Sequence, residues 1–199
     1  MEKNYRTKIK EKRGVIDLAH CENYIPWIKA NEFKQSYGTR YCFNDLFINR
    51  QIHCMSTLER DYYLITRSNA NVVAIFEQYP LLPYQTTMMI SEQLNYKHPM
   101  HPFKKNFIVM TTDFLILYKH DNGKYEWFAR AVKSEKQLLN SRVLEKLEIE
   151  KAYWSYHGIK WGIITENNID KTLVYNIMEC MSENYQDRTD FFKRLSTKI

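Results

Sequence analysis

Three charged residues in the sequence have types and spacing suited to one chemical task. Asp113 lies in an apolar, β-prone run, and Lys133 ends the next such run after the turn Asp121-Asn122-Gly123, a pattern that predicts a β-hairpin. A carboxylate can hold Mg²⁺, which activates a bound water, and the lysine can position that water or offset charge on a phosphate. Glu59, on a predicted helix nearby, completes the metal shell. The set predicts metal-dependent phosphodiester hydrolysis.

The hairpin can bring Asp113 and Lys133 together only in one parity of register. Side chains alternate between the two faces of a strand, so residues on one face must have matching parity. A two-residue turn would set Asp113 opposite Val132 and send Lys133 to the other face. A three-residue loop with Gly123 in the left-handed conformation sets Asp113 opposite Ala131, with Lys133 diagonally beside it. The hypothesis therefore predicts the odd-length loop or an equivalent bulge.

Each of these residues also has a purely structural interpretation. Ser56-Thr57-Leu58-Glu59 is a capping-box sequence, so Glu59 can simply close the first turn of a helix. Asp113 can be a carboxylate on an exposed strand face, and Lys133 a charge at a strand end. His98 and His101 have a ligand-like spacing, but the prolines around them preclude a regular helix and no Cys or acidic residue is near, so zinc is not favoured there.

The elements that must position these residues form an α/β pattern. We predict a strand pair over 39–54 that turns near Asn44-Asp45, a helix from Ser56, a strand over 71–78, a short helix over about 85–95 and the hairpin over 107–133. A second capping box at 134–137 predicts a helix that runs to about Tyr156 and stops at Gly158. On it Leu138, Leu144, Leu147 and Trp154 are expected in the core. Glu148 and Glu150 are expected on solvated faces, with a supporting role of Glu150 at the site as a less favoured alternative. A strand over 159–165 and two helical segments from Asp170 follow.

Composition limits the class of protein further. The 199 residues suit one α/β domain with a small appendage, and 29 Lys and Arg against 23 Asp and Glu favour a polyanionic partner. Residues 2–13 form a basic arm that can be a solvated tail or a phosphate-contacting segment. The widely spaced cysteines argue against a zinc ribbon or a disulfide framework. With no apolar run long enough to span a membrane, we expect a reduced, cytosolic, soluble protein.

At these residues the sequence resembles the TnsA family, the endonuclease subunit of heteromeric Tn-type (TnsABC) transposition systems. The resemblance runs in order across about residues 23–165. It is carried by NYIPW (23–27), LE (58–59), EQYPLLP (77–83), KHP (97–99), MTTDFL (110–115), VK (132–133), LEKLEIE (144–150) and YW (153–154).

The resemblance implies a restriction-endonuclease-like core, a mixed β-sheet flanked by helices, with a short helical C-terminal extension. The implied organisation is a basic arm over 1–22, a nuclease domain over 23–166 and the extension over 167–199. The implied activity is Mg²⁺-dependent cutting, with Mn²⁺ as a substitute, of the non-transferred (5′) strand at transposon ends. The implied partners are double-stranded DNA, a TnsB-type transposase and a TnsC-type AAA+ ATPase, in the bacterial cytoplasm and at the nucleoid when active.

Carried over by position, Glu59 and Asp113 look like metal ligands, Lys133 like the catalytic lysine, and the backbone carbonyl of Val132 like a further metal ligand. Two departures matter. The family usually has Gln or Glu two positions before the lysine, where this chain has Ala131, so weaker metal binding is a hypothesis. Better-known relatives also carry a larger C-terminal domain. Here the amphipathic segment 173–181 either packs on the core or docks a partner.

Two other functions stay open. The same fold can serve a stand-alone restriction-type or repair nuclease, which would cut without partners. A non-catalytic DNA-binding scaffold subunit is the third possibility; Ala131 favours it, and the presence of Glu59, Asp113 and Lys133 argues against it.

Overall fold

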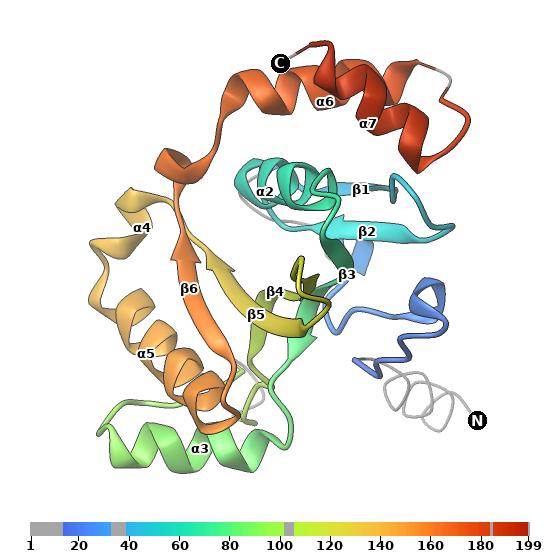
Figure 1. The fold of residues 1–199 in the computed structure, drawn as a ribbon. Coiled ribbons are helices and arrows are strands. Elements are labelled where there is room, and N and C mark those ends of the chain that lie inside the picture. Colours follow the sequence, from blue (N-terminus) through green and yellow to red (C-terminus); the bar gives the residue numbers. More distant parts are fainter. Residues whose placement is uncertain (1–13, 33–38, 102–105, 184, 199) are drawn as a thin grey trace, which may run out of the picture.

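The computed structural model describes residues 14–32, 39–101, 106–183 and 185–198, so the basic arm expected over 2–13 lies outside the described residues. Figure 1 shows how the elements are arranged. In chain order they are β1 (Tyr41–Asn44), β2 (Gln51–Cys54), α2 (Thr57–Arg67), β3 (Val72–Pro80), α3 (Tyr84–Gln93), β4 (Thr111–Lys119), β5 (Tyr125–Val132), α4 (Glu135–Leu138), α5 (Ser141–Tyr156), β6 (Lys160–Ile164), α6 (Lys171–Ser182) and α7 (Arg188–Ser196).

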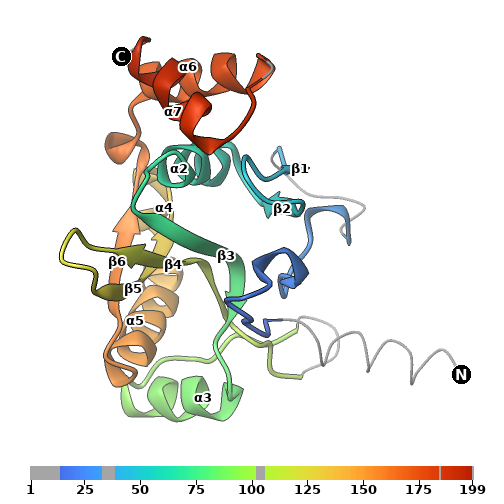
Figure 2. The ribbon, with the colours of Figure 1, turned by 45° about the vertical axis from the view of Figure 1, so that its right-hand side comes forward.

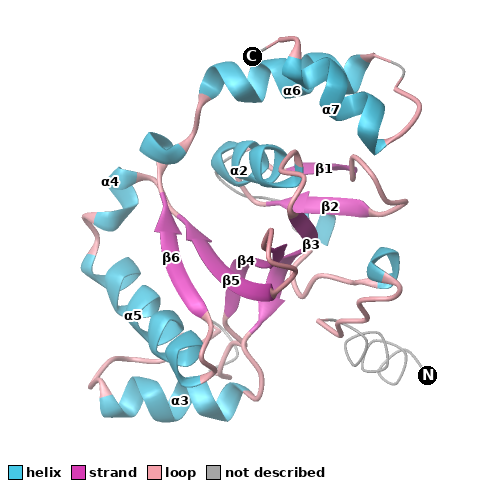
Figure 3. Cartoon of the chain, viewed as in Figure 1, coloured by secondary structure: helices cyan, strands magenta, loops and turns pink. Residues whose placement is uncertain are grey.

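The central sheet has the strand order β3-β4-β5-β6 (Figure 3). β3, β4 and β5 pair antiparallel, whereas β6 pairs parallel with β5. A parallel pair needs a crossover connection, which α4 and α5 supply. β1 and β2 form a separate antiparallel hairpin beside α2. The expected mixed sheet with flanking helices is confirmed.

Both faces of this sheet are covered, because its strands contain consecutive apolar residues whose side chains point to opposite faces in turn. On β4, Phe114 and Ile116 pack into a core shared with α2, α6 and α7. The alternate residues Leu115 and Leu117 pack into a second core, shared with α3 and α5. Figure 2 shows these two groups of helices at opposite ends of the molecule. Asp113 lies near the start of β4, and Lys133 directly follows the end of β5.

The β4–β5 hairpin has the register that the sequence hypothesis requires. Pairing along the two strands sets Asp113 level with Ala131. The last backbone hydrogen bonds before the tip leave a three-residue loop, 121–123. Gly123 in this loop has a φ of 82°, the left-handed conformation that glycine tolerates best. The predicted odd-length loop is confirmed.

The single helix predicted over 135–156 is wrong. α4 ends at Leu138, and the side chain of Asn140 accepts hydrogen bonds from the backbone N–H groups two and three residues ahead, which begins α5. Leu144, expected in the core, is 43% exposed, and Glu150, expected in solvent, is buried; Leu147 and Trp154 are buried as predicted.

Other boundaries differ by a few residues. The first hairpin is confirmed, but its strands are joined by the longer segment 45–50 rather than turning at Asn44-Asp45. β4 begins at Thr111, later than the predicted 107. α5 ends before Gly158, whose φ is 67°, as expected. Among the described residues no helix is long and apolar enough to cross a membrane.

The C-terminal helices pack on the body of the protein, as Figure 1 shows above α2. Ile177 of α6 and Phe191 of α7 are fully buried in the core that they share with α2. The packing interpretation of 173–181 is therefore confirmed. The outer side of α6 carries exposed Tyr175 and Met178, so docking of a partner there stays a prediction.

Candidate active site

Asp113 and Lys133 lie on the same side of the sheet and form an ion pair. The Lys133 ammonium donates to Asp113 Oδ2 at 2.6 Å and to the Val132 carbonyl at 2.8 Å. The same Asp113 oxygen accepts the backbone N–H of Val132 at 2.7 Å. Because the lysine follows the last residue of β5, the confirmed hairpin register alone brings these two groups together.

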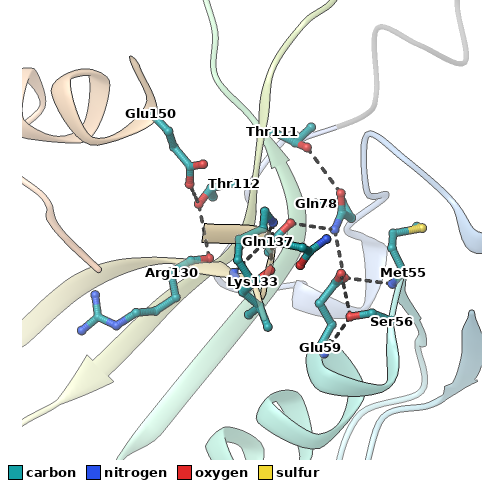
Figure 4. Close-up of polar contacts among 12 residues, drawn as sticks. Met55, Ser56, Glu59, Gln78, Thr111, Thr112, Arg130, Lys133, Gln137 and Glu150 are labelled. Atoms are coloured by element: carbon teal, nitrogen blue, oxygen red, sulfur yellow. Dashed lines mark hydrogen bonds and ion pairs between the residues drawn. The ribbon is translucent and has the colours of Figure 1, made fainter. Parts of the chain in front are cut away.

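Glu59 lies in the first turn of α2, where it does more than cap the helix. Its backbone N–H donates to Ser56 Oγ at 3.1 Å, the expected capping contact. Its carboxylate accepts from Ser56 Oγ at 3.1 Å and from the Met55 N–H at 2.9 Å. The oxygen bound by Met55 also faces the sheet, toward Gln78 (Figure 4). The structural interpretation of Glu59 is therefore confirmed, and its role as a metal ligand stays a prediction.

Gln78 joins the two carboxylates, and the sequence reasoning missed it. Its side-chain nitrogen donates to Glu59 Oε2 at 3.2 Å and to Asp113 Oδ1 at 3.4 Å. Thr111 Oγ1 donates to its amide oxygen at 3.3 Å. The side chain is 3% exposed. The available signal was the polar pair Glu77-Gln78 inside a strand that is otherwise rich in apolar residues.

Glu150 is a third carboxyl group at the site, on α5. It is 6% exposed, and one of its oxygens accepts from Thr112 Oγ1 and, at 3.0 Å, from Trp161 Nε1. It lines a pocket of about 310 Å³ together with Asp113, Lys133 and Lys146. The expectation of a solvated Glu150 is wrong because this residue lies three after Leu147 and four before Trp154, on the face of α5 that is buried.

The electrostatics of the site follow from burial and from the crowding of charge. Burial, and then the charge of Asp113, raise the pKa of Glu59 to about 7 and that of Glu150 to about 7. Burial lowers the pKa of Lys133, but the charge and hydrogen bond of Asp113 outweigh it and the net pKa is raised. Lys133 therefore stays protonated and positively charged, and it is suited to donate hydrogen bonds to a water or phosphate.

The residues present fit a magnesium ion with mixed oxygen ligands. Carboxylate oxygens of Glu59 and Asp113 converge on the Gln78 amide group, and the Val132 carbonyl lies on the other side of Asp113 beside Lys133. In the described part of the chain no three His, Cys, Asp or Glu side chains are grouped to hold a metal. The remaining ligands must then be amide or backbone oxygens and water, which Mg²⁺ accepts readily.

The first residue of the histidine pair is occupied by structural contacts. His98 is buried, and its two ring nitrogens form hydrogen bonds with Thr87 Oγ1 at 2.9 Å and with the Pro99 carbonyl at 3.0 Å. This places His98 in the packing between α3 and the loop that follows it.

The mixed sheet, its flanking helices and the carboxylate–lysine cluster at the strand ends define the class of restriction-endonuclease-like domains. The family model described as "TnsA-like endonuclease N terminal" matches residues 69–166. The chain is 36% identical over 170 residues to "Transposon Tn7 transposition protein TnsA" of Escherichia coli, a match that covers 85% of this chain and 59% of that relative. The chain belongs to the TnsA family, and it spans somewhat over half the length of this relative.

Proposed function

We propose that the chain is the endonuclease subunit of a cut-and-paste transposition system and hydrolyses the non-transferred (5′) strand at transposon ends. The observation that carries the proposal is the convergence of Glu59, Asp113 and Lys133 from three separate elements: Gln78 bridges the two carboxylates, and Lys133 pairs with Asp113. The similarity to a transposition protein and to an endonuclease family model supports it.

In this proposal Glu59, Asp113 and the Val132 carbonyl hold Mg²⁺, for which Mn²⁺ can substitute. The bound cation supplies a polarised phosphate and a water of lowered pKa. Asp113 holds the Lys133 ammonium in place through their 2.6 Å contact. Lys133 donates to the attacking water or to the phosphate, where it offsets negative charge in the transition state. Water is the nucleophile.

The proposed partners follow from the family. They are double-stranded DNA at the transposon ends, a TnsB-type transposase that cuts and joins the other strand, and a TnsC-type AAA+ ATPase. Phosphate contacts supply most of the affinity for DNA, whereas the transposase reads the end sequence. With such a substrate the protein acts in the bacterial cytoplasm, at the nucleoid.

The test is strand-resolved cleavage of a labelled transposon-end duplex by the chain with its partner transposase, ATPase and Mg²⁺. We expect 5′-strand cuts that require the cation, and a loss of at least about 10³-fold in their rate in Asp113→Ala, because removing one group of a catalytic unit costs several orders of magnitude. The exposed Asp121→Ala variant in the hairpin loop is the matched control and should cut at the unmodified rate.

Two outcomes would replace this proposal by an alternative. Clean double-strand breaks with Asp113→Ala would show that the chain is a non-catalytic scaffold subunit. Robust cutting by the purified chain without any partner would instead indicate a stand-alone restriction-type or repair nuclease.

A further inference from the structure

Gln78 has a backbone conformation that few residues of its type adopt. Its φ is 48°, in the left-handed region that is unfavourable for a residue with a β-carbon. The position is fixed on both sides, since its carbonyl accepts the Trp27 N–H at 3.2 Å and its strand continues into Tyr79, which pairs with Thr112. Such conformations persist where the surroundings determine them, and they cluster at functional sites.

The neighbours of Asp113 across the sheet differ in what they can offer a cation. Ala131, level with Asp113 on β5, has no side-chain atom that could bind a cation. Gln78 lies beside Asp113 on β3, because Glu77 pairs with Phe114 and Tyr79 with Thr112. Among these two neighbours, only Gln78 brings a side-chain oxygen to this level of the sheet.

The amide of Gln78 is turned the wrong way for a cation. Its NH₂ group faces Glu59 and Asp113 and satisfies both carboxylates with donated hydrogens. A half-turn of the amide would exchange its nitrogen and oxygen. Thr111 Oγ1, which now donates to the amide oxygen, could then accept from the nitrogen, since a hydroxyl both donates and accepts. In the turned orientation the amide oxygen would face the carboxylates of Glu59 and Asp113, which cannot donate to it, so that orientation is satisfied only with a cation between these oxygens.

We propose that Gln78 is a further residue of the metal centre, which stands in for the cation with its NH₂ group and turns its carbonyl oxygen to the cation on binding. The inference rests on the proposed function, which places Mg²⁺ at Glu59 and Asp113. It gives the site the side-chain ligand that Ala131 lacks. It also explains why a neutral, fully buried glutamine separates two carboxylates.

The test is the dissociation constant of Mn²⁺ for the full chain, read from the electron paramagnetic resonance of the free ion. Gln78→Met keeps the length of the side chain but offers no oxygen, and we expect at least tenfold weaker binding. Gln78→Glu restores an oxygen and adds charge, so its binding should equal or exceed that of the unmodified chain. Gln93→Met, at an exposed glutamine of α3, should bind Mn²⁺ unchanged.

Circular dichroism in EDTA establishes that each variant is folded. Binding by Gln78→Met within twofold of the unmodified chain would overturn the inference. The inference would also be overturned if Gln78→Glu bound Mn²⁺ as weakly as Gln78→Met. If Gln78→Met does not fold, weaker Mn²⁺ binding by Gln78→Glu than by the unmodified chain overturns the inference. Asp113→Ala distinguishes a failure of this inference from a failure of the proposed function. If Asp113→Ala leaves the dissociation constant of Mn²⁺ unchanged, the metal site and the proposed function are removed together. If only Asp113→Ala loses Mn²⁺ binding, the role of Gln78 alone is removed.

Discussion

Lys146 lies in the pocket beside Lys133 without a compensating anion. Within the described part of the chain no hydrogen bond or ion pair is formed by its ammonium group, although the side chain is half-buried. Burial, together with the charges of Arg142 and Lys133, lowers its pKa. An uncompensated cation at this place is suited to a DNA phosphate next to the one that is cut.

We expect Lys146→Ala to weaken binding of a transposon-end duplex several-fold. The slope of log K against log salt should fall in magnitude by about 0.9, the contribution of one phosphate contact. The measurement is fluorescence anisotropy over a salt series without divalent cation. Lys151→Ala on the same helix is the control, because that lysine is exposed and pairs with Glu148 at 3.6 Å. Equal salt slopes in the two variants would contradict the role of Lys146.

The buried Glu150 makes stability depend on pH. Its pKa is about 7 in the folded protein against an ordinary 4.5, so the folded state binds its proton more tightly than the unfolded chain does. The stability gained from that proton is fully present below pH 4.5 and is lost as the pH rises through 7. Above pH 7 the ionised form costs roughly 3 kcal/mol of folding free energy.

Glu150→Gln should therefore gain stability over the unmodified chain as the pH rises from 4.5 to 8. At pH 8 the gain is up to roughly 3 kcal/mol, and at pH 4.5 the two proteins should be nearly equal. Urea unfolding in EDTA at several pH values measures this. The exposed Glu148→Gln should show no such trend, and a constant difference for Glu150→Gln across the series would contradict the argument.

At the scale of the element, the β4–β5 hairpin depends on one left-handed residue. Gly123 has a φ of 82°, and a β-carbon there would meet no atom within 4 Å. Any effect of a side chain is therefore conformational. Because this loop sets the register that aligns Asp113 with Lys133, the cost of changing it measures how firmly the turn specifies the site.

Gly123→Val should lower the free energy of unfolding by about 1–2 kcal/mol, since β-branched residues avoid positive φ. Gly123→Asn should lose less than about half of that, because Asn tolerates the left-handed region. Urea denaturation of both variants gives the comparison. If the two substitutions cost the same, backbone conformation is not what fixes this loop.

At the scale of the whole molecule, the C-terminal helices are part of the core. The Arg188 guanidinium donates to the carbonyls of residues 69, 70 and 72, which ties α7 to the segment between α2 and β3. Phe191 is fully buried against Phe47 and Tyr185. Deleting these helices would uncover the core, so point variants test their roles more sharply than truncation does.

Phe191→Ala should cost about 3–5 kcal/mol in the free energy of unfolding, the usual loss for a buried phenylalanine. Tyr175→Ala, at a residue 61% exposed on α6, should stay within about 0.5 kcal/mol. Thermal and urea unfolding measure both. A small loss for Phe191→Ala would mean that α7 folds independently of the core.

Tyr175→Ala, with its fold intact, also tests whether the outer side of α6 docks a partner. Unchanged capture of the partner ATPase and transposase by this variant would remove the prediction of docking there.

Local patterns in the sequence determined most of the elements and the pair at the heart of the site. Capping boxes gave the starts of α2 and α4. The Asp-Asn-Gly turn gave the hairpin but left two loop lengths open, of which the structure has the three-residue one that aligns Asp113 with Lys133. These features depend on residues close in the chain, where backbone geometry leaves few choices. The roles of Glu59, Asp113 and Lys133 in catalysis and of Val132 in metal binding remain proposals.

Only the tertiary structure decided which distant segments contact one another. Gln78 and Glu150 each reach the site through packing of one element on another, β3 beside β4 and α5 against the sheet. The periodicity of 135–156 suggested one helix, but the cap at Asn140 begins a second helix there, and Glu150 lies on its buried face with Leu147 and Trp154. Whether a polar side chain is buried depends on which neighbour covers it, and no local pattern contains that information.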